Sequence, residues 1–184
     1  MERWTTDIIE WADISPESAQ LFIAQGEARL KATEETASSL DSSNDRMMNI
    51  ITSLLSVSLG YMFAGSQEYL QAVSFFVLCI STVSGAFLLS NLKSYPICTV
   101  GEEPKMVFTS QFIDNSYSPS QQYLNLVCQV METIQYKISH NHLVNTQRRA
   151  RLDRAKRVAL FIPLAFLLAA LYQYWLGYHL VWHR

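Results

Sequence analysis

Few residues of this chain have types and spacings that could support catalysis or metal binding. His140 and His142 lie two positions apart, and Glu102 and Glu103 are adjacent carboxylates. On a helix, positions i and i+2 point about 200° apart, so the two imidazoles cannot share a metal ion. We interpret His140, Asn141 and His142 as solvated polar residues on a helix, and the two glutamates as part of a solvated loop. Neither pair predicts a metal site.

Motifs for catalysis or nucleotide binding are absent from the sequence. It contains no P-loop, no G-x-G-x-x-G, no H-E-x-x-H and no G-x-S-x-G. The cysteines Cys79, Cys98 and Cys128 are odd in number and form no C-x-x-C pair, so we expect three reduced thiols. The sequence therefore predicts a protein that is not an enzyme and needs no cofactor.

A basic run at residues 148–157 holds six of the fourteen Lys and Arg. Such a run either binds nucleic acid or forms the cytoplasmic end of a membrane helix. At 100° per residue its bases surround the helix, whereas a helix that reads a groove gathers them on one face. An apolar run follows directly, so we favour a membrane collar in contact with lipid headgroups over nucleic-acid binding. The predicted collar comprises Arg148, Arg149, Arg151, Arg154, Lys156 and Arg157.

Three runs without a charged residue stand out, at 47–67, 69–92 and 158–182. A membrane-spanning helix needs about 20 predominantly apolar residues, and each run is long enough. A soluble helical protein with apolar core helices is the alternative, but buried core helices are rarely uncharged for this length. The sequence predicts an all-α membrane protein with three transmembrane helices, a hairpin plus a C-terminal span, and long cytoplasmic helical extensions.

The distribution of basic residues orients the spans. Arg46, Lys93 and the collar all lie on one side if the N-terminus and the middle segment are cytoplasmic. We expect a cytoplasmic N-terminus, a C-terminus outside, and an aromatic belt at Trp175, Tyr178 and Trp182. The predicted divisions are an acidic helical segment at 1–45, the hairpin at 46–92, a loop and helix ending in the collar at 93–157, and the third span at 158–184.

Two long helices are expected to lead into the spans. Ser15-Pro16 and Ser118-Pro119 read as helix starts. No proline intervenes before the end of the first span, and Pro163 is expected to kink the second long helix soon after it enters the third span. Residues 93–118 are expected to be irregular. Apolar residues at seven-residue spacing predict packing against another helix: Ile23, Leu30 and Ala37, with Leu40, Met47 and Leu54.

Two faces are predicted to dock protein. Trp4, Ile8 and Trp11 share one helical face whose neighbours are acidic, which favours a protein partner over anionic lipid. The second face is an apolar stripe on the helix that begins at Pro119: Leu124, Val127, Cys128, Met131, Ile134 and Ile138.

Small and hydroxyl residues form a stripe in each of the first two spans. The stripes are Ser53, Ser56 and Gly60 in the first span and Ser74, Ser81 and Gly85 in the second. Such patterns let helices approach closely in lipid, or they line a pore when subunits assemble. Both interpretations stay open. The absence of charge inside the runs disfavours a proton relay or a transporter of charged substrates.

The layout resembles that of the transmembrane effectors of bacterial Pycsar anti-phage systems and of related small membrane effectors of abortive infection. The stretches that carry the resemblance are SSNDRMMNIITSLLSVSLG and LVCQVMETIQYKISHNHLVNTQRRARLDRAKRVALF. The resemblance implies a protein of the bacterial inner (plasma) membrane that senses an infection signal and then damages that membrane. In Pycsar the signal is a cyclic pyrimidine nucleotide, and Lys93 and Lys105 are the bases of the 93–118 loop that could meet its phosphate.

The leading hypothesis is therefore a membrane-disrupting or pore-forming effector of a bacterial anti-phage defence system, triggered through its cytoplasmic part. Its expected partners are the lipid bilayer and further copies of the chain, and its candidate triggers are a signalling nucleotide or a cytoplasmic protein. One alternative is a non-enzymatic anchor or scaffold that recruits a soluble partner. Another is a phage exclusion membrane protein.

Overall fold

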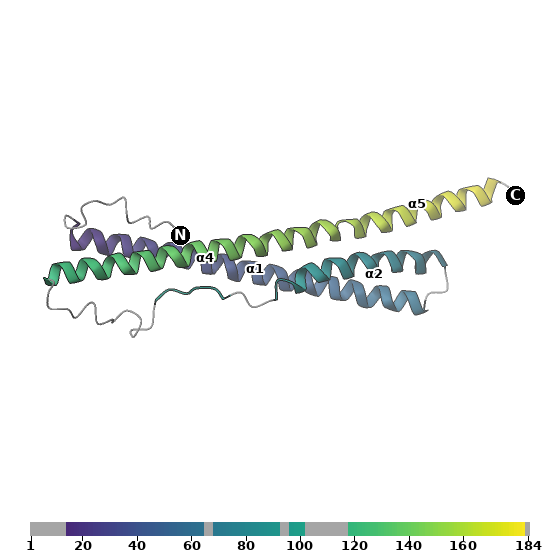
Figure 1. Ribbon diagram of the computed structural model, residues 1–184. Helices are drawn as coiled ribbons and strands as arrows, with labels where there is room; N and C mark the ends of the chain where they lie inside the picture. Colours follow the sequence, from purple (N-terminus) through teal and green to yellow (C-terminus); the bar gives the residue numbers. More distant parts are fainter. Residues whose placement is uncertain (1–13, 65–67, 93–95, 102–117, 183–184) are drawn as a thin grey trace. The chain divides into compact units, whose positions relative to one another are not determined.

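The computed structural model describes residues 14–64, 68–92, 96–101 and 118–182, and the regular structure in these ranges is entirely α-helical (Figure 1). The helices are α1 (Pro16–Ala64), α2 (Glu68–Leu89), α4 (Pro119–Ala159) and α5 (Phe161–Trp182). Three helical segments are long and apolar enough to cross a membrane: Pro16–Ala64, Leu70–Leu89 and Pro119–Gln173. The expectation of an all-α chain with three such helices is confirmed.

Both long helices begin with side-chain caps at the predicted residues. The backbone N–H of Ser18 donates to Ser15 Oγ over 3.2 Å, which satisfies one of the free donors at the start of α1. At the start of α4, Gln121 Oε1 accepts from the backbone N–H of Ser118 over 3.0 Å, and the Gln121 N–H donates back to Ser118 Oγ. This reciprocal pair is a capping box, and Pro119 follows it at the first helical position, where no N–H is needed.

The chain divides into two compact units. The helix-pair unit comprises Met1–Ser38 and Pro96–Asn145, and the hairpin unit comprises Ser39–Tyr95 and Thr146–Arg184. Helices α1 and α4 each contribute one part to each unit.

In the helix-pair unit, α1 and α4 pack through small and apolar residues. A Cβ placed on Gly26 of α1 would lie 3.0 Å from Ile134 Cγ2 of α4, so glycine is what allows Ile134 to approach the α1 backbone. Val127 and Ile134 are buried there. The stripe on α4 that was predicted to dock a partner is therefore covered within the chain at these two positions. The other buried apolar residues of the unit are Ala19, Leu30, Ala37 and Val144.

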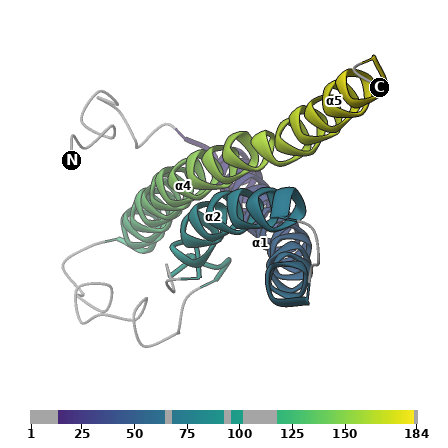
Figure 2. The same cartoon turned by 90° about the vertical axis from the view of Figure 1, so that its right-hand side faces the viewer.

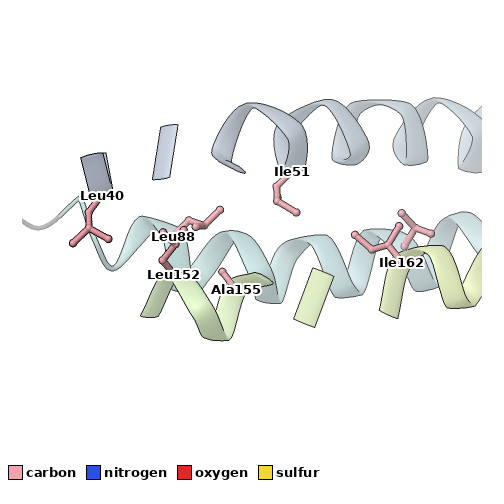
Figure 3. Packing of buried hydrophobic residues seen from close by; sticks show 7 residues of the cluster. Leu40, Ile51, Leu88, Leu152, Ala155 and Ile162 are labelled. Atoms are coloured by element: carbon pink, nitrogen blue, oxygen red, sulfur yellow. The ribbon is translucent and has the colours of Figure 1, made fainter. Parts of the chain in front are cut away.

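In the hairpin unit, α1 and α2 run antiparallel (Figures 1 and 2), and α5 packs against α2. Figure 3 shows side chains from all four helices pointing into one core. The buried members are Leu40, Ile51, Val77, Leu88, Leu152, Ala155 and Ile162. In lipid, association of helices depends on close packing rather than on removing apolar surface from water. Small residues allow such packing: Ala155 belongs to this core, and a Cβ on Gly85 would lie 3.6 Å from Ile51 Cγ2.

Helix α4 ends at Ala159 and α5 begins at Phe161, with a single turn residue, Leu160, between them. Pro163 explains the position of this break. It has no N–H to donate to the carbonyl of Ala159, and its ring crowds that same carbonyl. The interruption near the entry of the third apolar run was expected from this proline.

Large apolar side chains remain exposed along the helices that are apolar enough to span a membrane. On α5 the exposed residues are Phe161, Leu164, Phe166, Leu167, Leu168, Leu171, Tyr172 and Trp175. On α2, Phe75, Phe76 and Val83 are exposed as well. Soluble monomers rarely leave apolar patches of this extent open to water.

Candidate functional site

A group of polar side chains ties the three chain segments of the hairpin unit together at one end of α2. We call it the polar junction, and its members are Asp41 and Asn44 of α1, Ser90 and Asn91 directly after α2, and Arg148 and Arg151 of α4. Arg148 is buried and forms an ion pair with Asp41 through its Nη2 atom. Buried charges are found paired in this way because an unpaired one is costly.

Asn91 connects all three segments of the junction. Its Nδ2 donates over 3.3 Å both to Asn44 Oδ1 and to the backbone carbonyl of Arg148. The last turn of α2 tightens there, since the Asn91 N–H bonds the carbonyl of Leu88 over 2.9 Å. Such contacts satisfy groups that a helix end leaves free. Asn44, Asn91 and Arg148 are all buried, so the junction is a specific polar contact inside an apolar bundle.

Two further hydrogen bonds from side chains to carbonyls extend the junction along α4. Arg151 Nη1 donates to the Ser90 carbonyl over 3.0 Å. Ser84 Oγ of α2 donates to the Ala155 carbonyl over 2.7 Å, and Ser84 is fully buried. Sequence reasoning missed Asp41, Asn44, Ser84 and Asn91 as site residues. The available signal was their polarity at positions that continue the apolar seams of α1 and α2.

The six bases of the predicted collar differ in how exposed their side chains are. Arg149, Arg154, Lys156 and Arg157 are exposed, whereas Arg148 is buried and Arg151 partly so. Arg148 and Arg151 thus have an inward role that the predicted collar did not include. Lys156 and Arg157 also line a shallow groove of about 510 Å³ together with Met47, Asp153 and Pro163. Contact of the outward bases with lipid headgroups stays a prediction.

The stripe of the second span lies inside the unit. Ser74, Ser81 and Gly85 are all buried, and a Cβ on Gly85 would lie 3.6 Å from Ile51 Cγ2 of α1. This arrangement matches the helix-packing interpretation for α2.

The stripe of the first span lies outside. Ser53, Ser56 and Gly60 are exposed, and none of the described residues lies within 4 Å of a Cβ built on Gly60. The Ser53 and Ser56 hydroxyls donate to the carbonyls of Asn49 and Thr52 in their own helix, over 2.9 and 3.0 Å. The buried serine of α1 is instead Ser58. Two stripes that look alike in sequence therefore have opposite surroundings.

An apolar groove of about 650 Å³ lies between α2 and α5. Its lining is Ala72, Val73 and Phe76 of α2 with Ala165, Leu168, Ala169 and Tyr172 of α5. The Tyr172 hydroxyl is the one polar side-chain group in this lining, so the groove lacks the converging polar groups that orient a substrate.

In the helix-pair unit, the interpretation of Asn141 as a solvated residue was wrong. Asn141 is fully buried and bonds both Thr33 of α1 and the backbone of Cys98. His142 is exposed, as expected, while His140 stacks on Tyr136 and contacts the Pro96 carbonyl. Among the described residues, no three His, Cys, Asp or Glu side chains are placed to hold a metal ion.

The pKa of one thiol in this unit, that of Cys128, is shifted. Partial burial, and then the negative charge of Glu132, raise the pKa of Cys128 above its usual value. A raised pKa leaves less of the reactive thiolate at a given pH.

Other predicted site residues lie outside the residues that the structure describes. Trp4, Ile8 and Trp11 precede the described residues, and the side chains of Tyr178 and Trp182 are not described. Trp175, the remaining member of the predicted aromatic belt, is exposed on α5.

No protein-family model matches the chain, and neither a curated protein nor a solved structure matches it.

Proposed function

We propose that this chain is a non-enzymatic, oligomeric membrane effector that makes its membrane leaky when its cytoplasmic part is triggered. The setting that its layout resembles is bacterial anti-phage defence by abortive infection. The observation that carries the proposal is the exposed face of the first span. Ser53, Ser56 and Gly60 are left uncovered by the side chains that the structure describes, while the matching stripe of α2 is buried.

An exposed hydroxyl face has a specific use in a membrane. Each hydroxyl bonds a carbonyl of its own helix, so it can face lipid without leaving its proton unsatisfied. When copies assemble, the same face offers small residues for close contact and hydroxyls for a hydrated path. The protein can thus exist as a tight bundle and later contribute a polar surface to an assembly.

The rest of the chain supports a membrane location. Exposed apolar residues cover α5, and Trp175 has the amphipathic ring typical of the membrane interface. Arg149, Arg154, Lys156 and Arg157 are exposed just before that helix. We propose that these bases hold the start of α5 at the cytoplasmic face, with the N-terminus inside and the C-terminus outside.

The test is leakage from vesicles. The purified full chain is reconstituted into phosphatidylethanolamine–phosphatidylglycerol vesicles loaded with carboxyfluorescein, at increasing protein-to-lipid ratios. We expect dye release from the wild type at high ratios and reduced release from the double variant S53L/S56L, because leucine removes the hydroxyls from the exposed face.

The matched control is I50L/V57L, which changes two exposed apolar residues of the same helix, α1. It is expected to leak like the wild type. Vesicles that stay intact at every ratio would contradict the proposal and would favour a membrane anchor. Equal release from S53L/S56L and the wild type would exclude the serine face as the leak path.

A further inference from the structure

The groove of about 510 Å³ beside Lys156 and Arg157 combines charge with an apolar wall. We call it the collar groove, and it lies in the hairpin unit, where α4 is followed by α5. Four of its lining residues are apolar and three are charged, so the groove offers an apolar and an ionic surface to one ligand. The lining is Met47 of α1, Asp153, Lys156, Arg157 and Ala159 of α4, Leu160 at the turn, and Pro163 of α5.

Most of the lining lies on one side of the chain around the end of α4. Asp153, Lys156, Arg157 and Leu160 follow one another at intervals of three and four residues, which makes them neighbours on a helix. The hairpin core uses other residues of this segment, such as Leu152. Both bases and Leu160 are exposed. The groove is therefore built from side chains that the packing of the bundle leaves available.

The two bases of the groove have no partner among the described residues. Arg148 of the same helix is paired with Asp41. In contrast, no hydrogen bond or ion pair within the described part of the chain involves the side chain of Lys156 or Arg157, and Asp153 forms no ion pair with either of them. Since two bases face one carboxylate, the groove has a net positive charge that the bundle does not neutralise.

These properties select the ligand. A small soluble anion would contact the bases and leave the apolar wall unused, and a hydrocarbon chain would leave the bases unused. A phospholipid uses both, because it joins a phosphate to acyl chains. Basic pockets between membrane helices on the cytoplasmic side are suited to anionic headgroups. Lys and Arg can place their apolar stems along such a groove and keep their charges at headgroup level.

We infer that the collar groove is a binding site for one anionic phospholipid of the phosphatidylglycerol class. Lys156 and Arg157 bind the phosphate, and Met47 and Leu160 contact the first part of an acyl chain. The net positive charge favours an anionic lipid over a zwitterionic one. Two of the exposed bases before α5 thus bind one lipid molecule, and the remaining ones are attracted to the membrane surface in general. The inference rests on the membrane location in the proposed function and does not require leakage.

The site is tested by native mass spectrometry of the full chain, released from detergent micelles that contain equal amounts of phosphatidylglycerol and phosphatidylethanolamine. We expect the wild type to retain one phosphatidylglycerol in preference to phosphatidylethanolamine. K156Q/R157Q should bind phosphatidylglycerol roughly tenfold more weakly, because both contacts with the phosphate are lost. R149Q/R154Q removes two exposed bases of α4 outside the groove, so it is the matched control and should bind like the wild type.

Two further measurements separate a lipid site from a site for any anion. L160N keeps the charge of the groove but removes an exposed part of its apolar wall, so it should weaken phosphatidylglycerol binding by about threefold or more. Inorganic phosphate in large excess should not displace the lipid, because it cannot use the apolar wall. Displacement by phosphate, together with unchanged binding by L160N, would overturn the lipid site in favour of a simple anion site.

Other outcomes would also overturn the inference. Equal retention of the two lipids by the wild type would exclude selection by charge. Equal loss of binding in K156Q/R157Q and R149Q/R154Q would mean that the lipid meets the whole basic surface and not the groove. Leakage from vesicles without preferred retention of phosphatidylglycerol would overturn the lipid site alone. Preferred retention without leakage at any protein-to-lipid ratio would instead overturn the leak and support the lipid site.

Discussion

Arg148 and Asp41 form an ion pair whose two members differ sharply in exposure: the Arg148 side chain is 9% exposed and the Asp41 side chain 60%. Arg148 therefore depends on its partner more than Asp41 does. Water can solvate Asp41 without Arg148, but little water reaches the guanidinium. This inequality allows a test of what the polar junction contributes to stability.

Removing Asp41 should cost more than removing the Arg148 charge. D41A leaves a buried cation unpaired, and we expect it to lower the free energy of unfolding by about 1–3 kcal/mol, between the values typical of exposed and buried pairs. R148M keeps an apolar stem and leaves an exposed carboxylate, so its cost should be below about 1 kcal/mol. Denaturant unfolding in detergent, followed by circular dichroism, measures both.

The double variant D41A/R148M should recover most of the loss seen in D41A, because no unpaired charge then remains. R149M, at an exposed base next along α4, is the control and should change stability little. If D41A and R149M have equal effects, the ion pair contributes nothing to the bundle.

The glycines Gly85 and Gly60 should respond differently to the same change. A Cβ on Gly85 already lies 3.6 Å from Ile51 Cγ2, so G85L would force α1 and α2 apart and cost about 1–3 kcal/mol. A Cβ on Gly60 meets none of the described residues within 4 Å, so G60L should leave the unfolding free energy of the monomer nearly unchanged. Under the proposed function it should instead alter dye release. Equal loss of stability in both variants would contradict the different surroundings of the two stripes.

The sequence predicted the helices well because their signals are local. Ser15-Pro16 and Ser118-Pro119 mark helix starts through caps, and uncharged runs mark the segments that are apolar enough to span a membrane. The seam of Leu30, Ala37 and Leu40 was also found, since these residues are buried. Each of these features depends on residues that lie within a few helical turns of one another along the sequence.

The polar contacts could not be predicted in the same way. Asn141 and His142 are adjacent polar residues, yet Asn141 is buried and His142 is exposed. What distinguishes them is a partner far along the chain, Thr33 or Cys98, and helical periodicity carries no information about that partner. The same holds for the two serine stripes, because packing between helices decides which stripe is covered.

Pro163 should control the break between α4 and α5 at Leu160. P163A restores an N–H that can bond the Ala159 carbonyl, and we expect a continuous helix through Leu160. Spin labels at A150C and A170C, in a chain whose natural cysteines are replaced by serine, report the change by electron spin resonance. In a straight helix the two backbone positions lie about 30 Å apart. The distance distribution should move toward this value in P163A, and an unchanged distribution would mean that packing between helices, and not Pro163, maintains the break.

The thiol of Cys128 should react slowly, and Glu132 should be part of the reason. Burial raises the pKa of Cys128, and the negative charge of Glu132 adds to that effect, so less thiolate is present at a given pH. E132Q removes the charge and leaves most of the burial. We therefore expect alkylation of Cys128 by iodoacetamide at pH 8 to be faster in E132Q than in the parent, by a few-fold. A C79S/C98S background confines the reaction to Cys128, and E27Q, a charge change on the exposed surface of α1, is the control. If E132Q and E27Q react at the same rate, burial alone determines the reactivity of Cys128.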